Sequence, residues 1–119
     1  MVAVAVGGVV GAALRWFVLD VFPAGGGVPW TVLVINVAGS AVVGAVLVDG
    51  WRRPQLRDAV AVGFCGGFTT FSTFAVEVAA MLRDGRLAIA AVYVALSVGG
   101  AVIAALAGAA AARRLRVPA

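Results

Sequence analysis

Residues 63–74, with the sequence GFCGGFTTFSTF, combine backbone breakers, hydroxyl side chains and aromatic rings in one short run. The pair Gly66 and Gly67 weakens a helix in the middle of an otherwise apolar segment. Inside a membrane, irregular backbone is tolerated only where protein buries it or where it lines a wet cavity. Interrupted helices of this kind bind ions, because freed carbonyl groups attract cations and exposed N–H groups attract anions. The run therefore predicts an ion site at a helix that breaks at its glycine pair.

The aromatic residues of this run can contribute to a path for an anion. Phe71 and Phe74 are three residues apart and share one helix face. An aromatic ring has a negative face and a positive edge, so ring edges attract an anion without a fixed full charge. The anion is then not held too tightly to leave, as conduction requires. The alternative is a simple packing stripe, because Phe64, Phe68 and Phe71 also follow helical spacing.

Two polar side chains outside the run have both a functional and a structural interpretation. Asn36 lies midway along an apolar segment, and its amide can donate two hydrogen bonds to an anion. The structural alternative is a hydrogen bond between helices. Arg15 is costly to bury, at roughly 2.5–3.5 kcal/mol at the centre of a membrane helix. It predicts either an electropositive vestibule that draws anions or a side chain that extends to the lipid headgroups.

Three further polar residues lie inside apolar segments. Glu77 follows Phe74 by one helical turn and is the only carboxylate well inside such a segment. It is either a proton carrier, as in a transporter, or a partner to an arginine or to a backbone donor. Tyr93 and Ser97 are four residues apart and share a helix face, where they either extend a hydroxyl-lined track or pack.

Membrane helices must position these residues. The 119 residues are 64% hydrophobic and 12% charged, whereas soluble domains are roughly 45–50% apolar and about 25% charged. A membrane helix needs about 20 apolar residues, so four of them fill the chain. We expect one all-α membrane domain over residues 1–119, with spans at about 2–21, 30–48, 58–82 and 87–111. The expected connections are a turn at 22–29, a polar loop at 49–58 and a tight turn at 83–86. The loop has room for a short surface helix with Trp51 at the membrane interface.

The distribution of arginine predicts the orientation of the chain. With four spans, both termini and the loop at 49–58 lie on one side of the membrane. That side holds six arginines and the other holds two or three, and the richer side is the cytoplasmic one. The six are Arg52, Arg53, Arg57, Arg113, Arg114 and Arg116, against Arg83, Arg86 and Arg15.

Composition excludes several function classes. The formal charge is +4 and the isoelectric point is about 11.1, but the arginines gather at span ends, so nucleic acid is not the expected partner. A single cysteine, Cys65, allows no internal disulfide and no cysteine-rich metal site. With no histidine, no carboxylate pair and no nucleophile beside a base, the chain offers no enzyme chemistry.

Three motifs, in their order along the chain, resemble the Fluc/CrcB family of fluoride channels. They are GGVVGAALRW in the first span, NVAGS in the second and GFCGGFTTFSTFAVE in the third. The resemblance extends over the whole chain in length, number of spans and motif order. It implies a fluoride-selective channel that exports toxic fluoride passively. Such a protein would be a multi-pass protein of the inner (plasma) membrane of a bacterium.

The resemblance also implies an assembly and a set of site residues. The assembly would be an antiparallel dimer of four-helix subunits, with two pores along the interface and a central structural Na+ at the break in the third helix. Gly66 and Thr69 would hold this sodium ion through their backbone carbonyls. The pore residues would be Asn36, Phe71 and Phe74, with a polar track of Ser72, Thr73, Tyr93 and Ser97, and with Arg15 in the vestibule.

The arginine distribution departs from the simplest pattern of that family. A homodimer with dual topology needs nearly balanced arginine on its two sides, so that both orientations insert, and the balance here is skewed. The skew indicates a heterodimer with an oppositely oriented paralogue, with a homodimer as the other possibility. Two rival functions remain. One is a small proton-coupled multidrug exporter, which needs a carboxylate midway along its first span, and the other is an accessory subunit of a membrane complex.

Overall fold

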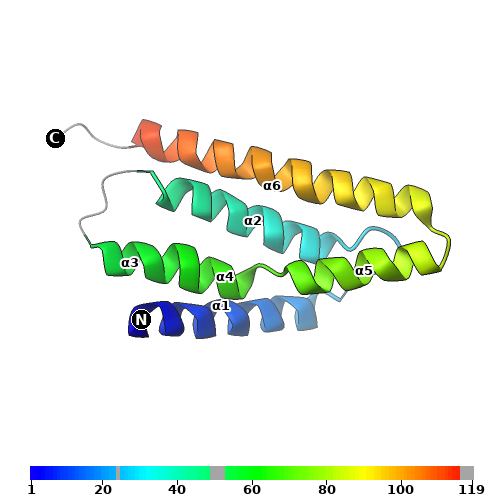
Figure 1. Ribbon diagram of the computed structural model, residues 1–119, viewed down its shortest axis with the longest axis horizontal. Helices are drawn as coiled ribbons and strands as arrows, with labels where there is room; N and C mark the ends of the chain where they lie inside the picture. Colours follow the sequence, from blue (N-terminus) through cyan, green and yellow to red (C-terminus); the bar gives the residue numbers. More distant parts are fainter. Residues whose placement is uncertain (24, 49–52, 116–119) are drawn as a thin grey trace.

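The computed structural model describes residues 1–23, 25–48 and 53–115, and within these ranges every regular element is a helix (Figure 1). The loop residues Trp51 and Arg52 and the tail residue Arg116, for which the sequence made predictions, lie outside the described residues. The helices are α1 (Val2–Val21), α2 (Trp30–Val46), α3 (Pro54–Asp58), the π-helix η1 (Ala59–Phe64), α4 (Cys65–Phe68), α5 (Phe71–Arg83) and α6 (Leu87–Leu115).

Several of these helices can cross a membrane. Three helical segments have the necessary length and apolar character, namely α1, the segment Pro54–Arg83 and α6. The helix α2 is equally apolar but has only 17 residues, which gives a length of about 25 Å against a hydrocarbon core of about 30 Å. The helix α6 reaches Leu115 and is longer than the span expected at 87–111.

The third helical segment begins earlier than the sequence predicts. Residues 49–58 were expected to form a polar loop, but α3 starts at Pro54 and continues directly into η1. Proline at the first helical position suits a helix start, because its φ is already helical and its missing N–H would have no helical partner there. A short helix within 49–58 was among the expectations, but α3 continues the third span and is not a separate surface helix.

The interruption in this segment is not at the glycine pair. Gly66 and Gly67 both lie inside α4, and the two residues that leave the helical conformation are Thr69 and Thr70. Thr69 has ψ 157° and Thr70 has φ −145° and ψ 113°, which are extended values. Gly67 is helical because it is a packing residue: a Cβ there would collide with the carbonyl oxygen of Gly8 in α1. The expected position was wrong because close helix packing, and not flexibility, explains this glycine.

The helices pack in two groups, and glycines bring their backbones into contact within each group. In one group α1 packs against η1 and α4, and in the other α2 packs against α6 (Figure 1). At several positions an added Cβ would overlap a main-chain oxygen of the partner helix, as expected for small residues at membrane helix contacts. These positions are Gly7 against Ala59, Gly11 against Phe64, Gly63 against Val4, Gly44 against Ala105 and Gly108 against Ala41.

A tight turn joins α5 to α6. Gly85 has φ +74°, a left-handed conformation that glycine adopts without steric cost. The amide of Arg86 donates to the carbonyl of Met81 at 2.9 Å, which satisfies a free carbonyl at the end of α5. The Arg86 guanidinium also donates to the carbonyl of Gly26, so this turn is tied to the connection between α1 and α2.

The described arginines are divided between the two ends of the bundle. The start of α1, the start of α3 and the end of α6 lie at the same end in Figure 1. Arg53, Arg57, Arg113 and Arg114 therefore share that end, whereas Arg83 and Arg86 lie at the other. Arg15 lies at neither end, because its side chain contacts the interrupted segment.

A cluster of buried side chains lies where α2, α5 and α6 meet. Its buried members are Leu33, Met81, Ala90 and Tyr93, and Phe74 packs against them. Many other large apolar side chains are exposed on the single chain, as in a helix bundle whose outer surface faces lipid or a second subunit.

Candidate functional site

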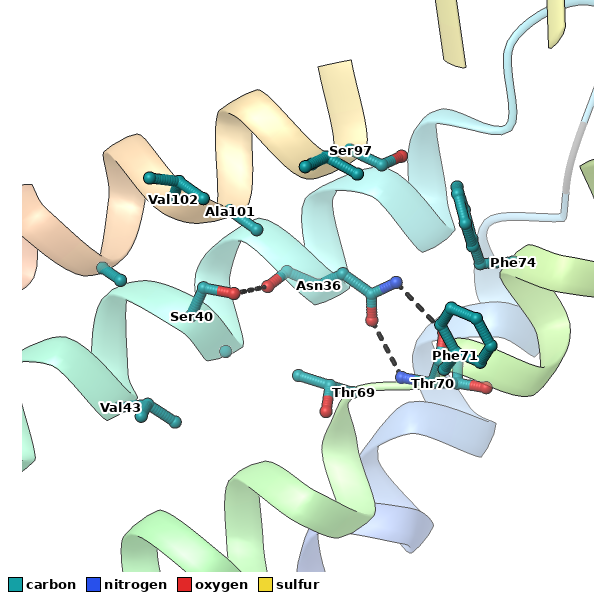
Figure 2. Close-up of a pocket in the computed structure, with 13 residues that line it drawn as sticks. Asn36, Ser40, Val43, Thr69, Thr70, Phe71, Phe74, Ser97, Ala101 and Val102 are labelled. Carbon is teal, nitrogen blue, oxygen red and sulfur yellow. Dashed lines mark hydrogen bonds between the residues drawn. The ribbon is translucent and has the colours of Figure 1, made fainter. Parts of the chain in front are cut away.

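Asn36 holds the interrupted segment through both polar atoms of its amide. The Thr70 N–H donates to Asn36 Oδ1 at 2.8 Å, and Asn36 Nδ2 donates to the Thr70 carbonyl at 3.1 Å (Figure 2). A residue outside a helix has no intrahelical partner for these groups, and leaving them unpaired in an apolar environment is costly. The structural interpretation of Asn36, a hydrogen bond between helices, therefore describes one role of this residue.

Arg15 contacts the same segment from α1. Its Nη1 donates to the Thr69 carbonyl at 3.2 Å, and the side chain is half-buried. The Thr69 hydroxyl donates back at 2.7 Å to the carbonyl of Cys65, the first residue of α4. The guanidinium therefore lies beside the interruption and does not extend along the helix to a membrane surface.

Thr70 caps the helix that carries the aromatic pair. Its Oγ1 accepts a hydrogen bond from the Thr73 N–H at 3.1 Å, which satisfies one of the free donors at the start of α5. The same hydroxyl donates to Thr73 Oγ1 at 3.1 Å. Phe71 and Phe74 occupy this first turn, so the cap lies directly at the base of both rings.

A groove of about 480 Å³ runs beside the interruption (Figure 2). Its polar lining comes from Asn36, Ser40, Thr69, Thr70 and Ser97. The rest of the lining is apolar and includes the rings of Phe71 and Phe74, with aliphatic residues of α2 and α6. The groove thus combines a few polar groups with aromatic and aliphatic walls, as expected of a site for a small ligand or ion.

The two rings differ in exposure. Phe71 is 78% exposed on the single chain, whereas Phe74 is half-buried against the core. Their centroids are 5.9 Å apart and the rings are tilted by 45°. Phe74 in turn lies 5.1 Å from the ring of Tyr93. This tilted arrangement presents ring edges as well as faces.

The hydroxyl groups of α6 point in two directions. Tyr93 is fully buried, and its hydroxyl donates to Glu77 Oε1 at 2.8 Å. Ser97 is buried and lines the groove, and its Oγ has no hydrogen-bonding partner among the described residues. An unpaired buried hydroxyl is uncommon in proteins, and this one belongs to a residue of the groove wall.

The structure brings together some of the residues that the sequence singled out. Asn36, Thr69, Phe71, Phe74 and Ser97 line the groove. The others have different surroundings. Arg15 contacts the interruption, Gly66 and Ser72 are exposed, Thr73 bonds to Thr70, and Tyr93 bonds to Glu77.

Sequence reasoning missed Thr70, Gly39 and Ser40. Thr70 was not singled out, although a threonine directly before the first turn of a helix is a recognised capping signal. Gly39 lies against the Thr69 methyl group, where a Cβ would collide with it. The Ser40 hydroxyl donates to the Asn36 carbonyl at 2.8 Å. No local pattern reveals the contact made by Gly39, because it depends on how α2 and α4 pack.

Comparison with known proteins gives the family. A family model described as "CrcB-like protein, Camphor Resistance (CrcB)" matches residues 2–109. The chain belongs to the CrcB family. A similar CrcB relative from Geobacillus kaustophilus (strain HTA426), "Fluoride-specific ion channel FluC 2", is 42% identical over 117 residues, which cover 93% of this chain and 91% of the relative.

Two further relatives have a similar name. "Fluoride-specific ion channel FluC" from Bordetella petrii is 41% identical over 118 residues, covering 96% of this chain and 91% of the relative. A protein of the same name from Chlorobium phaeobacteroides is 37% identical over 108 residues, covering 87% and 84%. The resemblance to the Fluc/CrcB family drawn from three motifs is thus confirmed over most of the chain.

Proposed function

We infer that this chain is a subunit of a fluoride-specific ion channel in a cell membrane. The observation that supports this best is the groove, where Phe71, Phe74, Asn36 and Ser97 meet beside an interrupted helix, in a chain whose CrcB relatives are named fluoride-specific ion channels. A channel conducts an ion and performs no chemical reaction on it. The apolar helices make the chain a multi-pass membrane protein, and we assign it to the inner membrane of a bacterium.

The groove offers fluoride replacements for its hydration shell. The ion is small and strongly hydrated, so donors must take the place of water. The Asn36 amide has two N–H groups and uses one for the Thr70 carbonyl, so the second is available. The Ser97 hydroxyl has no partner among the described residues. The edges of Phe71 and Phe74 add weak attraction without a full charge, which lets the ion leave.

The subunit is expected to function as a dimer. The groove of one chain is open along one side, and Phe71 at its rim is 78% exposed. A second, antiparallel subunit facing this side would close the groove into a pore. The skew of the described arginines, four at one end and two at the other, favours pairing with an oppositely oriented paralogue. Relatives named FluC 2 come from organisms such as Geobacillus kaustophilus and Nocardia farcinica, and their numbering is compatible with paired genes.

The chain can contribute main-chain oxygens to a structural sodium ion at the dimer centre. The described residues contain no group of three or more histidine, cysteine or acidic side chains, so a cation would depend on other oxygens. The carbonyls of Gly66 and Thr69 lie at the end of α4, where helical partners run out. Gly66 is exposed and has open space around it, but the Thr69 carbonyl already accepts a hydrogen bond from Arg15. The Thr69 carbonyl oxygen has a second lone pair, so the two carbonyls can still bind a cation. A sodium site predicts higher thermal stability of the protein in sodium than in N-methylglucamine, and equal stability in the two would contradict it.

Fluoride efflux from liposomes tests the channel function. Purified protein reconstituted at low density should release trapped fluoride rapidly and chloride much more slowly. A proton-coupled multidrug exporter would instead move organic cations, and α1 lacks the mid-span carboxylate that this class needs, since its first acidic residue is Asp20. Folded protein that releases no fluoride, alone or with its paralogue, would favour an accessory subunit.

A further inference from the structure

We propose that Thr70 is a positioning residue of the pore, clamped by Asn36, which fixes where α5 begins and so places Phe71 and Phe74. This inference rests on the proposed channel function. Thr70 is 7% exposed and takes part in four hydrogen bonds, two through its main chain and two through its hydroxyl. It therefore connects the interruption to α2 on one side and to α5 on the other.

The main chain of Thr70 is fixed by a reciprocal pair of bonds. The Asn36 amide both accepts from its N–H at 2.8 Å and donates to its carbonyl at 3.1 Å. Two hydrogen bonds of opposite direction to one planar amide fix the orientation of the Thr70 main chain as well as its distance from Asn36. Asn36 is itself carried by a regular part of α2, where the Ser40 hydroxyl donates to its carbonyl. The two hydrogen bonds from Asn36 thus fix the position of Thr70 relative to α2, which also lines the groove.

The hydroxyl of Thr70 transmits this position to α5. It accepts from the Thr73 N–H and donates to the Thr73 hydroxyl, both at 3.1 Å. Phe71 and Phe74 flank Thr73 in the first turn, so a shift of the cap would move both rings. Side chains on an uncapped first turn fray more readily than those on a capped one.

The same bonds argue against a direct role of this hydroxyl at the ion. Its one hydrogen is donated to Thr73, and its oxygen already accepts from an N–H. Thr70 lines the groove but offers no free donor to an anion. Its contribution is therefore through the rings that it positions.

Amide hydrogen exchange in lipid nanodiscs separates this role from a general effect on stability. Thr70→Ser keeps the capping oxygen, whereas Thr70→Val keeps the branched shape and removes it. Loss of the cap should speed exchange at Thr73 about fivefold, from the typical cost of removing a threonine cap, while Thr70→Ser stays near wild type. Thr31→Val is the matched control. Thr31 lies in the first turn of α2, and its hydroxyl donates to the carbonyl of Phe22, which follows α1; neither residue lines the groove.

Fluoride efflux at low protein density supplies the second readout. The fraction of vesicles that empty reports assembled channels, and the rate constant of emptying reports conduction per channel. We expect Thr70→Val to lower the rate constant several-fold and Thr70→Ser to restore it. A merely structural role would reduce the fraction of emptied vesicles and leave the rate constant unchanged, and that result would overturn the proposal.

Two further outcomes have a defined meaning. If wild-type protein releases no fluoride, the channel function fails, but the exchange measurement still tests the cap and the clamp. If Thr70→Val does not assemble, the exchange rate of the Thr70 amide is compared between wild type and Asn36→Ser. Slow exchange in wild type that becomes fast in Asn36→Ser supports the clamp. Unprotected exchange of that amide in wild type would overturn it.

Discussion

At the scale of single residues, the aromatic pair is the part of the site with the most specific chemistry. Phe71 and Phe74 lie 5.9 Å apart at a tilt of 45°, one exposed at the rim and the other packed on Tyr93. Neither ring carries a charge, so their effect on an anion depends on where their edges point. Such an effect should be lost when the ring is replaced by an aliphatic side chain of similar size.

Replacing either ring tests this directly. Phe71→Ile or Phe74→Ile should cut fluoride flux by at least about tenfold, which corresponds to a barrier higher by about 1.4 kcal/mol, because the positive ring edge is lost. Size-exclusion chromatography should show the same assembly as wild type. Phe22→Ile, at an exposed position after α1, is the matched control and should conduct normally. Normal flux in both pore variants would remove the rings from the mechanism.

The polar residues at this scale show what sequence can and cannot give. Residue type alone identified Asn36 as important and offered two interpretations, an ion donor or an interhelical bond. The structure shows Asn36 as a hydrogen-bonding partner between segments, since its amide is bonded to the Thr70 main chain. Its second N–H is not used in these bonds and is available to donate to an anion. For Tyr93, the four-residue spacing to Ser97 left a hydroxyl-lined track and simple packing as alternatives. Its hydroxyl donates to Glu77 of α5, a contact between two helices that spacing along one helix cannot reveal.

At the scale of helices, glycine acts mainly as a contact residue. The pairing of α1 with η1 and α4 depends on positions where a single added methyl group would meet a main-chain oxygen. The sequence located the spans because apolar composition and arginines at the ends are properties of each segment alone. It misplaced the interruption at Gly66–Gly67 because Gly67 is held in a helix by a contact with Gly8. The π-helix η1 was likewise not foreseen, since nothing in its composition distinguishes it from an α-helix.

Neighbouring glycines on α1 provide a matched test of this packing. A Cβ at Gly7 would overlap the Ala59 carbonyl, whereas at Gly8 the nearest atom, the Gly63 oxygen, would be 3.7 Å away. We expect Gly7→Ala to lower the free energy of unfolding by about 1–3 kcal/mol through overpacking. Gly8→Ala should be neutral or slightly stabilising, because alanine favours a helix. Thermal unfolding in detergent measures both, and equal stability of the two variants would contradict the packing model.

At the scale of the whole molecule, charge and shape determine orientation. The described part of the chain is 55 Å long, enough to span a bilayer. Arg53, Arg57, Arg113 and Arg114 lie at one end, against Arg83 and Arg86 at the other. The positive-inside rule predicts that the richer end faces the cytoplasm. Arg15 does not enter this balance, because it is used inside the bundle at Thr69.

Labelling of single cysteines in intact cells measures the orientation. In a Cys65→Ala background, Gly25→Cys and Gln55→Cys place a thiol at opposite ends, each at an exposed position. A reagent that does not cross membranes should label Gly25→Cys strongly and Gln55→Cys weakly. This result would require a differently oriented partner for an antiparallel dimer. Equal labelling at the two positions would instead indicate dual insertion and a homodimer.

The open side of the groove has a consequence for the cell that makes this protein. In the antiparallel dimer proposed above, a newly inserted chain that has not met its counterpart would carry only half of the pore, and lipid would cover the open side of its groove. Hydrocarbon there cannot solvate a halide, so the immature subunit gives ions no route across. Permeability would then arise only when two chains meet, so the insertion of single subunits would leave the ion gradients of the cell intact.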